Sequence, residues 1–349
     1  MKIELFTYFS ADNYGATLQT YSTIKILEKL GHCVELANYK IPEPKHSILK
    51  KILLYPKHLR FNRFRNKYFL NISENFCSYK DLYERPPLAD CYLTGSDQTW
   101  NPEISKNMAP GFFLNFGDDN ILRGSYSASI GMDQWEDTIW INKNDVKKAL
   151  SRFDFLSIRE KSGVEILKND FQKDAVLVID PVLLFQSYPE LTGECVEEPI
   201  IVTYKLSNSK AFYDKVRNIA ARNGLKCRSI GSLRRISGYL CAYPESIELW
   251  IKRLGTARYV FTDSFHGTVI SIIYHRQFVY SVGNAKRNTR IVSLLSLLGL
   301  EDRITNDHST EEEIQCIMNR PIDWEMVDKK LDSFRESSIN FLERSLSNR

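Results

Sequence analysis

The sequence has 349 residues, of which 43% are hydrophobic and 26% charged, as is usual for a soluble globular protein. This length exceeds what one core holds comfortably and predicts two domains followed by a tail. No apolar run reaches the roughly 20 residues of a membrane-spanning helix, and the first residues enter a strand without a signal-peptide core. The seven scattered cysteines and six separated histidines favour a cytoplasmic protein with neither disulfides nor a metal site.

The net charge of +4 is distributed unevenly. Eight Lys and Arg residues and no acid lie between Lys45 and Phe69, which leaves about −4 for the remainder of the chain. The simpler interpretation is one or two helices, broken at Pro56, that present a basic outer face to solvent. The alternative is peripheral contact of residues 45–69 with an anionic membrane, because basic amphipathic segments bind lipid headgroups.

The first half of the chain alternates strands and helices in the pattern of a parallel sheet. A strand at 2–9, a turn at 10–15, a helix at 16–30 and a strand at 33–39 form a βαβ unit. Further strands are expected at 90–94, 124–130, 155–160 and 176–180. The Gly-rich dinucleotide fingerprint is missing, so NAD is not expected.

Two loops that follow strands carry polar side chains suited to a polyhydroxylated ligand. The turn at 10–15 contains Asn13 and Tyr14, and the loop at 95–102 contains Asp97, Gln98 and an indole. The structural alternative for the second loop is a capped turn whose Trp100 fills the core.

Arg159 closes the strand expected at 155–160, where the ligand-binding loops of a parallel sheet gather. The structural alternative is an ion pair with Glu160 or another carboxylate, and spacing alone does not distinguish it from ligand binding. The stretch 186–199 contains three helix breakers and several glutamates, and reads as an interdomain linker.

A second set of strands and helices follows the linker. We expect an N-terminal domain at 1–185, a C-terminal domain at 200–305, and a helical tail at 306–349 that packs back on the first domain. The C-terminal domain includes a cationic loop, 283–290, which contains Lys286 and Arg290 and leads into a helix expected at 291–298. Without other information, a solvated basic loop is the simpler interpretation of this segment.

The stretch 259–268 is the most informative part of the second half. An apolar strand ends at Thr262, and Asp263 and Ser264 are suited to capping the helix that follows. His266 and Gly267 then lie at a helix N-terminus, which attracts anions. Gly267 would admit a ligand close to the backbone, and His266 can transfer a proton near neutral pH. The structural alternative is a histidine that only hydrogen-bonds a neighbouring loop.

Together, the 95–102 string Gly-Ser-Asp-Gln-Thr-Trp-Asn-Pro, the 13–15 turn, Arg159 and the His266 stretch resemble the polysaccharide pyruvyl transferase family. The resemblance runs from residue 1 to about Arg303. It implies an α/β fold with two Rossmann-like domains facing across a cleft (GT-B-like) and C-terminal helices. It also implies a bacterial transferase of polysaccharide biosynthesis, as for capsule or exopolysaccharide.

The activity implied by the resemblance is transfer of a pyruvyl group from phosphoenolpyruvate to two hydroxyls of a sugar, free or lipid-linked, without a cofactor. Under this hypothesis His266 is the catalytic acid, Asp97 with Asn13 faces the acceptor, and Arg159 and Arg290 hold the donor. Further substrate-binding positions are Tyr14, Gln98, Ser264, Gly267 and Lys286.

One position departs from some members of the family, which have an arginine where this chain has Ser264. A hydroxyl donates one hydrogen bond but carries no charge, so the donor clamp must draw on other cations. Two alternatives remain open, namely a GT-B glycosyltransferase that uses a nucleotide sugar and a non-catalytic glycan-binding protein on the same fold.

Overall fold

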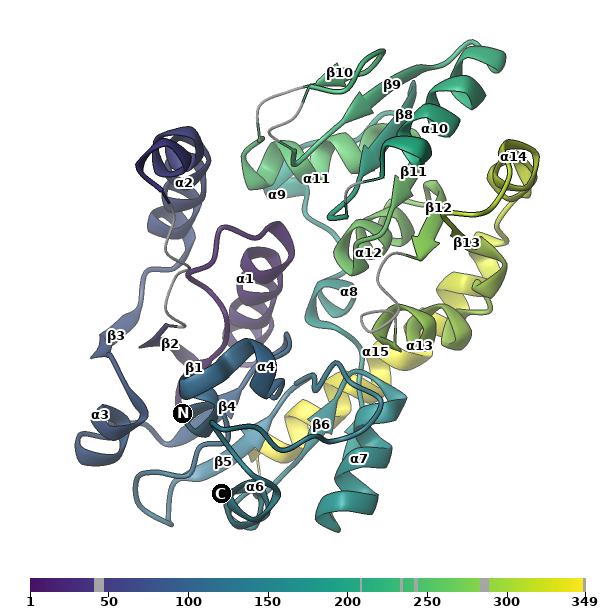
Figure 1. The fold of residues 1–349 in the computed structure, drawn as a ribbon. Coiled ribbons are helices and arrows are strands. Elements are labelled where there is room, and N and C mark those ends of the chain that lie inside the picture. Colours follow the sequence, from purple (N-terminus) through teal and green to yellow (C-terminus); the bar gives the residue numbers. More distant parts are fainter. Residues whose placement is uncertain (41–46, 208, 233–234, 242–243, 283–288, 348–349) are drawn as a thin grey trace. The chain divides into compact units, whose positions relative to one another are not determined.

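The computed structural model describes residues 1–40, 47–207, 209–232, 235–241, 244–282 and 289–347 (Figure 1). The chain divides into two compact units. The first unit comprises Met1–Ile52, Arg65–Phe185 and Asp332–Arg349, and the second comprises Leu53–Phe64 and Gln186–Leu331. Each unit is built on its own parallel sheet.

The first unit contains a five-stranded parallel sheet in the order β3-β2-β1-β4-β5. Its strands are β1 (Lys2–Phe6), β2 (Cys33–Tyr39), β3 (Ile72–Phe76), β4 (Cys91–Thr94) and β5 (Leu122–Ser125). A short parallel pair, β6 (Ser157–Ile158) and β7 (Val176–Leu177), joins the sheet through isolated parallel bridges from Phe155 to Gly124 and from Ile158 to Ala128. The predicted strands at 124–130, 155–160 and 176–180 are therefore shorter than expected.

The helices of the first unit connect these parallel strands. They are α1 (Tyr14–Lys29), α3 (Tyr79–Glu84), α4 (Pro102–Ser105), α5 (Ala109–Phe112), α6 (Lys143–Leu150), α7 (Lys161–Phe171) and α8 (Pro181–Phe185), with the 3₁₀ turn η1 (Lys106–Met108). The core between sheet and helices is rich in aromatic side chains, among them Phe6, Tyr39, Tyr92 and Phe116, whose rings pack edge-on or tilted.

Helix α2 (Ile48–Tyr68) is one continuous helix, so the predicted break at Pro56 is wrong. Proline removes one backbone donor, and the remaining hydrogen bonds of a 21-residue helix maintain it through this position. Arg65, one of the eight basic residues, is buried rather than surface-exposed, and its guanidinium lies 2.7 Å from the carboxylate of Asp12. The basic outer face of the segment is therefore smaller than the sequence suggested.

The second unit contains a six-stranded parallel sheet in the order β10-β9-β8-β11-β12-β13. Its strands are β8 (Glu198–Tyr204), β9 (Lys226–Ser229), β10 (Leu240–Cys241), β11 (Ala257–Thr262), β12 (Gln277–Val282) and β13 (Ile304–Asn306). In both units the first strand lies inside the sheet and the order reverses beside it, which is the doubly wound arrangement.

Helices also connect the strands of the second unit. They are α9 (Pro189–Thr192), α10 (Lys210–Arg222), α11 (Ile247–Thr256), α12 (Phe265–Ile273), α13 (Thr289–Leu298) and α14 (Glu311–Asn319), with the 3₁₀ turn η3 (Glu301–Arg303). Thr310 and Glu313 form a capping box at the start of α14, where the sequence has three consecutive glutamates.

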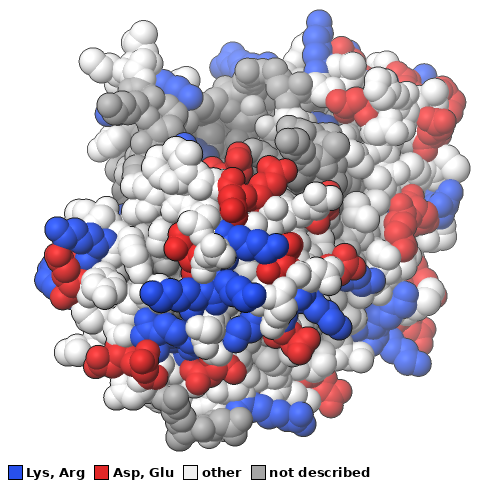
Figure 2. All heavy atoms as spheres, turned by 60° about the horizontal axis from the view of Figure 1, so that its bottom comes forward, with Lys and Arg blue, Asp and Glu red and all other residues white. Residues whose placement is uncertain are grey.

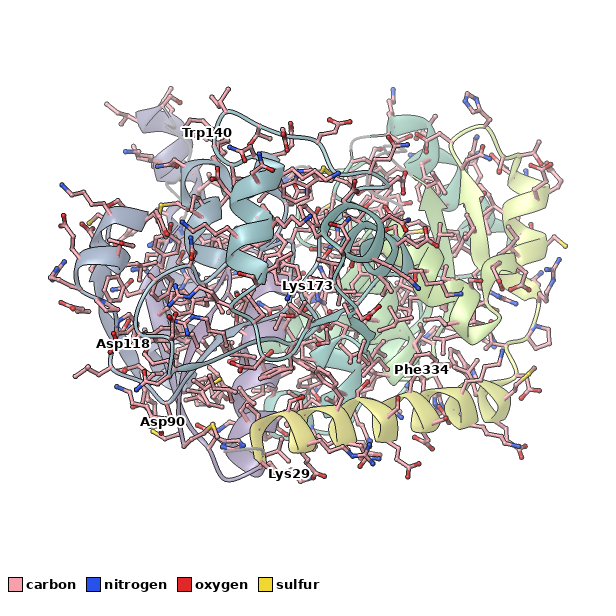
Figure 3. All side chains as sticks on the ribbon, turned by 90° about the horizontal axis from the view of Figure 1, so that it is seen from below. Lys29, Asp90, Asp118, Trp140, Lys173 and Phe334 are labelled. Atoms are coloured by element: carbon pink, nitrogen blue, oxygen red, sulfur yellow. The ribbon has the colours of Figure 1, made fainter. Side chains whose placement is uncertain are left out.

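Helix α15 (Trp324–Ser347) ends the described chain as a long uninterrupted helix, with Phe334 at the position labelled in Figure 3. Its C-terminal part belongs to the first unit, where Ser338 Oγ accepts a hydrogen bond from the backbone N–H of Ile179 and the ring of Phe341 packs edge-on against Phe155.

Surface charge is mixed rather than segregated by sign on the face that Figure 2 shows. Figure 2 shows one face on which Lys and Arg side chains are interspersed with Asp and Glu side chains, in keeping with a net charge of only +4. Within the described part of the chain, no helix is both long enough and apolar enough to span a bilayer.

Candidate functional site

In the first unit, charged side chains gather around Arg159, which follows β6. One guanidinium nitrogen donates to Asp180 Oδ2 at 2.7 Å and to Ser96 Oγ at 3.1 Å, and the other lies 3.4 Å from Asp97 Oδ1. The Arg159 side chain is only 1% exposed. Burial alone would lower the pKa of Arg159, but Asp180 and Asp97 outweigh it and raise the pKa above its usual value. The ion-pair interpretation accounts for these contacts, with Asp180 and Asp97 as partners, and direct donor contact by Arg159 stays a prediction.

Asp97 is the more accessible carboxylate of this cluster. Its side chain is 16% exposed, compared with 1% for Asp180. Its φ of 87° lies in the left-handed region, which costs a non-glycine residue on the order of 1–3 kcal/mol and is common at functional sites. The surrounding loop holds this conformation, since Asp97 Oδ1 accepts from the backbone N–H of Gln98 and the Tyr8 hydroxyl donates to the Gln98 carbonyl.

The rest of the 95–102 loop serves the fold. Trp100 is 1% exposed, stacks on Phe113, and donates its indole N–H to the carbonyl of Phe112 at 3.0 Å. The core-filling interpretation of Trp100 is therefore right. The side-chain oxygen of Gln98 accepts from Asn101 at 3.1 Å, so this amide already stabilises its own loop.

Glu160 is a structural residue that the sequence analysis assigned only as a partner for Arg159. It is fully buried, and its Oε1 accepts hydrogen bonds from Ser129 Oγ and from the backbone N–H groups of Ile130 and Gly131 at 2.8–3.0 Å. This carboxylate fixes the segment after β5 beside the loop that contains Asp97, because Gly131 lies against the Gln98 side chain. The sequence signal that could have indicated this role is the position of Glu160 directly after Arg159, at the end of a predicted strand.

The predicted pair Asn13 and Tyr14 lies at the start of α1. Asn13 caps this helix by accepting from the backbone N–H of Ala16 at 3.1 Å, and Tyr14 is buried in its first turn. Both residues therefore have structural roles, and their contact with substrate stays a prediction.

In the second unit, β11 leads directly into α12, as predicted. Ser264 caps the helix, and its hydroxyl accepts from the backbone N–H of Gly267 at 3.4 Å. His266 lies in the first turn, 8% exposed, with its ring centroid 5.2 Å from that of Phe265. The imidazole therefore lies in the positive field of a helix N-terminus, where an anion is favoured.

Gly267 has a packing role that the sequence did not indicate. A Cβ added there would lie 2.5 Å from Thr262 Oγ1 and 3.0 Å from the ring of Tyr204. The absence of a side chain is needed so that α12 can approach its own strand, and ligand approach to the backbone of Gly267 stays a prediction.

A buried cluster around Lys205 was missed by the sequence analysis. The Lys205 side chain is 0% exposed, and its Nζ lies 3.2 Å from Ser281 Oγ and 3.9 Å from the carboxylates of both Asp263 and Asp307. Burial lowers the pKa of Lys205, while the two carboxylates oppose that effect. Only the fold brings together these residues, which are separated by up to about 100 positions.

Asp263 ties the Lys205 cluster to the start of α12. Its carboxylate accepts from the backbone N–H groups of Leu206 and Ser207 at 2.6 and 2.9 Å, and from the Ser207 hydroxyl. Asp263 therefore fixes the loop after β8 to the turn that precedes His266.

Of the predicted cations, Arg290 lies at the start of α13 with its guanidinium carbon 5.8 Å from the ring centroid of Phe265. Lys286 lies outside the described residues. The structure thus groups Asp97, Gln98 and Arg159 in the first unit, and Ser264, His266, Gly267 and Arg290 in the second. Within the described ranges, no set of three His, Cys, Asp or Glu side chains is arranged to hold a metal.

Several solved structures share this fold. The UDP-GlcNAc 2-epimerase of Neisseria meningitidis, bound to UDP-GlcNAc, matches with a TM-score of 0.53 and 9% identity over 100% of both chains. A putative UDP-N-acetylglucosamine 2-epimerase of Listeria monocytogenes matches with a TM-score of 0.56 and 10% identity, over 96% of this chain and 90% of that one. A Thermobaculum terrenum O-GlcNAc transferase variant matches with a TM-score of 0.53 and 13% identity, over 100% of this chain and 66% of the transferase.

These neighbours are GT-B proteins, so the predicted class of two Rossmann-like domains with C-terminal helices is confirmed. Identities this low establish the fold alone. None of the curated proteins matches the sequence. The sequence model of the polysaccharide pyruvyl transferase family matches residues 13–285, which is most of the chain. The chain belongs to the polysaccharide pyruvyl transferase family.

Proposed function

We propose that this protein transfers a pyruvyl group from phosphoenolpyruvate to two hydroxyls of one sugar and forms a pyruvate ketal. The sugar belongs to a polysaccharide or to its lipid-linked precursor. The observation that carries this proposal is the family match over residues 13–285, which includes both the Asp97 loop and the His266 turn.

The reaction is balanced without an oxidant, a reductant or a metal ion. A proton is added to the vinyl CH₂ carbon of phosphoenolpyruvate, and one sugar hydroxyl attacks the neighbouring carbon and loses its own proton. The second hydroxyl then displaces phosphate from the same carbon, and its proton leaves with phosphate. Two hydroxyl protons are thus lost, one replacing the proton consumed at carbon and one leaving on phosphate.

His266 is the proposed acid, because imidazole titrates near neutral pH and lies at a helix N-terminus that attracts the anionic donor. Arg290 and Lys286 are proposed to complete the donor site in place of the arginine that Ser264 replaces. Asp97 is proposed to orient the acceptor hydroxyls, since it is the accessible carboxylate of its cluster. Arg159 positions Asp97 and is also proposed to hold the donor.

Phosphate release distinguishes this proposal from a GT-B glycosyltransferase. The purified full chain is incubated with phosphoenolpyruvate and a panel of nucleotide-linked and lipid-linked sugars, while phosphate and nucleotide are measured. We expect phosphate release that depends on a sugar acceptor and a mass increase of about 70 Da on that sugar, the mass of an added pyruvyl group. Release of nucleotide from a nucleotide sugar, with no phosphate from phosphoenolpyruvate, would contradict it. Binding of glycan with neither release would assign a non-catalytic role.

We also propose that α2 contacts an anionic membrane surface, as would suit a lipid-linked acceptor. Ile48, Ile52, Tyr55 and Leu59 are spaced by three or four residues, so they share one stripe of the helix, and all four are exposed. An exposed apolar stripe beside lysines is the composition of helices that lie in the headgroup region.

A further inference from the structure

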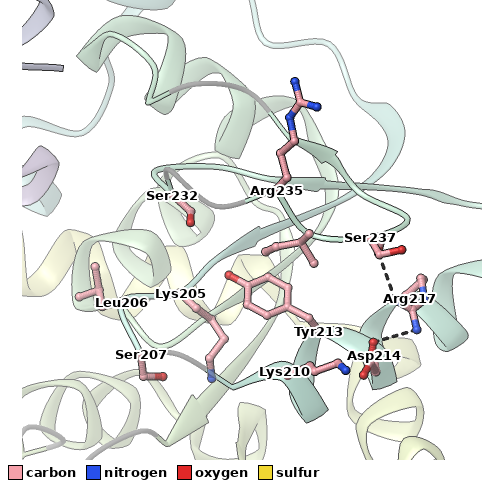
Figure 4. A pocket seen from close by; sticks show the side chains of 11 residues that line it. Lys205, Leu206, Ser207, Lys210, Tyr213, Asp214, Arg217, Ser232, Arg235 and Ser237 are labelled. Carbon is pink, nitrogen blue, oxygen red and sulfur yellow. Dashed lines mark hydrogen bonds and ion pairs between the residues drawn. The ribbon is translucent and has the colours of Figure 1, made fainter. Parts of the chain in front are cut away.

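The second unit contains a pocket that the predicted site residues do not line. It has a volume of about 440 Å³ and lies between the loop after β8, the start of α10 and the loop after β9 (Figure 4). Four of its lining residues are cations: Lys205, Lys210, Arg217 and Arg235. Neither Ser264, His266 nor Arg290 belongs to the lining.

The four cations differ in how their charge is balanced. Arg217 pairs with Asp214, another lining residue, at 2.8 Å, as the dashed line in Figure 4 marks. Lys205 is balanced by the carboxylates described above. Lys210 and Arg235, in contrast, form no ion pair with any described carboxylate, and both are exposed to solvent. The pocket therefore has two uncompensated positive charges on different elements.

The other lining residues fit an organic anion better than a lone inorganic ion. Ser207, Ser232 and Ser237 supply polar groups, and Tyr213 and Ile236 supply an aromatic and an aliphatic wall. The volume lies within the usual range for small-molecule sites and is much larger than one phosphate group requires.

We infer that this pocket binds the diphosphate group of a diphosphate-linked sugar, with Lys210 and Arg235 each contacting one phosphate. Two separate cations match two linked phosphates, and the tyrosine and isoleucine wall accommodates the part attached to them. Arginine and lysine both bind phosphate through charge-assisted hydrogen bonds. The inference rests on the pocket residues and does not require pyruvyl transfer, although it would name the acceptor class of that reaction.

Calorimetric titration of the full chain with inorganic pyrophosphate at low salt tests the inference. We expect Lys210→Gln/Arg235→Gln to weaken pyrophosphate binding roughly 10–100-fold, because each substitution removes a charged hydrogen bond. Lys252→Gln/Lys329→Gln is the matched control, since it removes the same charge from exposed positions of the same unit that do not line the pocket. Equal affinity of the two double variants, or no binding of pyrophosphate to the native chain, would overturn the inference.

Further titrations identify the source of the diphosphate. A uridine diphosphate sugar and a short-chain prenyl diphosphate sugar should each bind through Lys210 and Arg235, and the tighter ligand identifies the carrier. A sugar 1-phosphate should bind at least tenfold more weakly, and equal binding would contradict a diphosphate site. Displacement of pyrophosphate by phosphoenolpyruvate in a His266→Gln background would show that the pocket belongs to the donor and would overturn the assignment. These readouts measure binding alone, so they remain interpretable if pyruvyl transfer fails.

Discussion

The two units share a sheet plan but treat charge differently at the ends of their strands. In the first unit, Arg159 is enclosed and balanced by Asp180 and Asp97, so its charge is used inside the protein. In the second unit, Lys205 is balanced in the same way, but Lys210 and Arg235 stay uncompensated around a pocket. The first arrangement fixes the position of a carboxylate, whereas the second attracts an anion from solution.

This difference predicts that substitutions in the two units will affect different measured properties. Removing a charge from the enclosed cluster leaves a buried partner unpaired, so the loss should appear mainly in the free energy of unfolding. Removing an exposed charge from the pocket of the second unit, or the proposed acid His266 from the start of α12, should appear mainly in binding or turnover. The predictions below test the contrast from the largest expected effect to the smallest.

The largest effect is expected at His266. If the imidazole protonates the donor, His266→Gln should lower turnover by roughly 10²–10⁴-fold, because general acid catalysis contributes about that much. The free energy of unfolding should change little, since glutamine retains a polar side chain at this capped helix start. Phosphate release and thermal unfolding are measured on the same sample.

His308→Gln is the matched control, because His308 is an exposed histidine of the same unit. It should retain native turnover. A folded His266→Gln variant with near-native phosphate release would remove His266 from the acid role.

Asp180 provides the corresponding test in the first unit. Asp180→Ala leaves the buried Arg159 guanidinium without its shortest ion pair, and breaking such a pair costs about 3–5 kcal/mol. Asp97→Asn should change the free energy of unfolding by less than about 1 kcal/mol, because Asp97 is partly exposed and asparagine also tolerates positive φ. Calorimetric unfolding compares the two variants.

The variants of the Arg159 cluster should differ in the opposite way in activity, when turnover is measured per folded molecule. Asp97→Asn should lower turnover with sugar, whereas Arg159→Lys should destabilise the chain and also raise the KM for phosphoenolpyruvate, because lysine lacks the planar fork of a donor clamp. An unchanged KM in Arg159→Lys would instead leave Arg159 with a structural ion pair alone. Equal stability of Asp180→Ala and Asp97→Asn would contradict the enclosed-cluster description.

The features of the fold and the site that depend on neighbouring residues could be predicted from the sequence. Strand-to-helix order, the cap at Ser264 and the position of His266 follow from patterns within about ten residues, and all were predictable. The Lys205 cluster and the cationic pocket were not, because Lys205, Asp263, Ser281 and Asp307 meet only after the sheet forms. The prediction of a helix break at Pro56 was wrong for the opposite reason. Proline does remove a helical hydrogen bond, but the other hydrogen bonds of α2 maintain the helix despite that loss.

Glu4 sharpens the comparison, since it is a buried carboxyl whereas Lys205 is a buried amine. Burial raises the pKa of Glu4 to about 8, with the nearby Glu35 adding to the rise, while Ser73 and Lys2 oppose it. In the folded state the carboxyl therefore keeps its proton to a higher pH than in the unfolded chain. Its contribution to stability is complete below about pH 4.5 and is lost as the pH rises toward 8.

We expect Glu4→Gln to remove this part of the pH dependence. The native chain should lose up to a few kcal/mol of unfolding free energy between about pH 5 and pH 8 relative to the variant. Denaturant unfolding at several pH values measures the difference. Glu136→Gln is the control, because Glu136 is an exposed glutamate of the same unit and leaves the surroundings of Glu4 unchanged. Parallel curves for native chain and Glu4→Gln would show that Glu4 is ionised in the folded protein.

The smallest effect concerns α2, whose two halves differ in the exposure of their apolar side chains. Phe61 and Phe64 near its end are buried, whereas Ile48 and Leu49 at its start are 78% and 81% exposed. The exposed half should bind anionic vesicles, because each basic residue near such a surface contributes about 1 kcal/mol and the apolar stripe adds shallow insertion.

Lys50→Glu/Lys51→Glu/Arg63→Glu should abolish co-sedimentation with anionic vesicles at low salt. Arg60 is kept native, because it donates to the carbonyl of Pro244 and its reversal would disturb the fold. Ile48→Ser/Ile52→Ser separates the apolar contribution. At high salt, screening makes the charge contribution to binding small, so this variant should weaken vesicle binding more at high salt than at low salt. Lys252→Glu/Lys329→Glu controls for net charge. If neither the native chain nor any variant sediments with anionic vesicles, the exposed stripe of α2 faces water or another protein, and a lipid-linked acceptor would have to reach the enzyme without it.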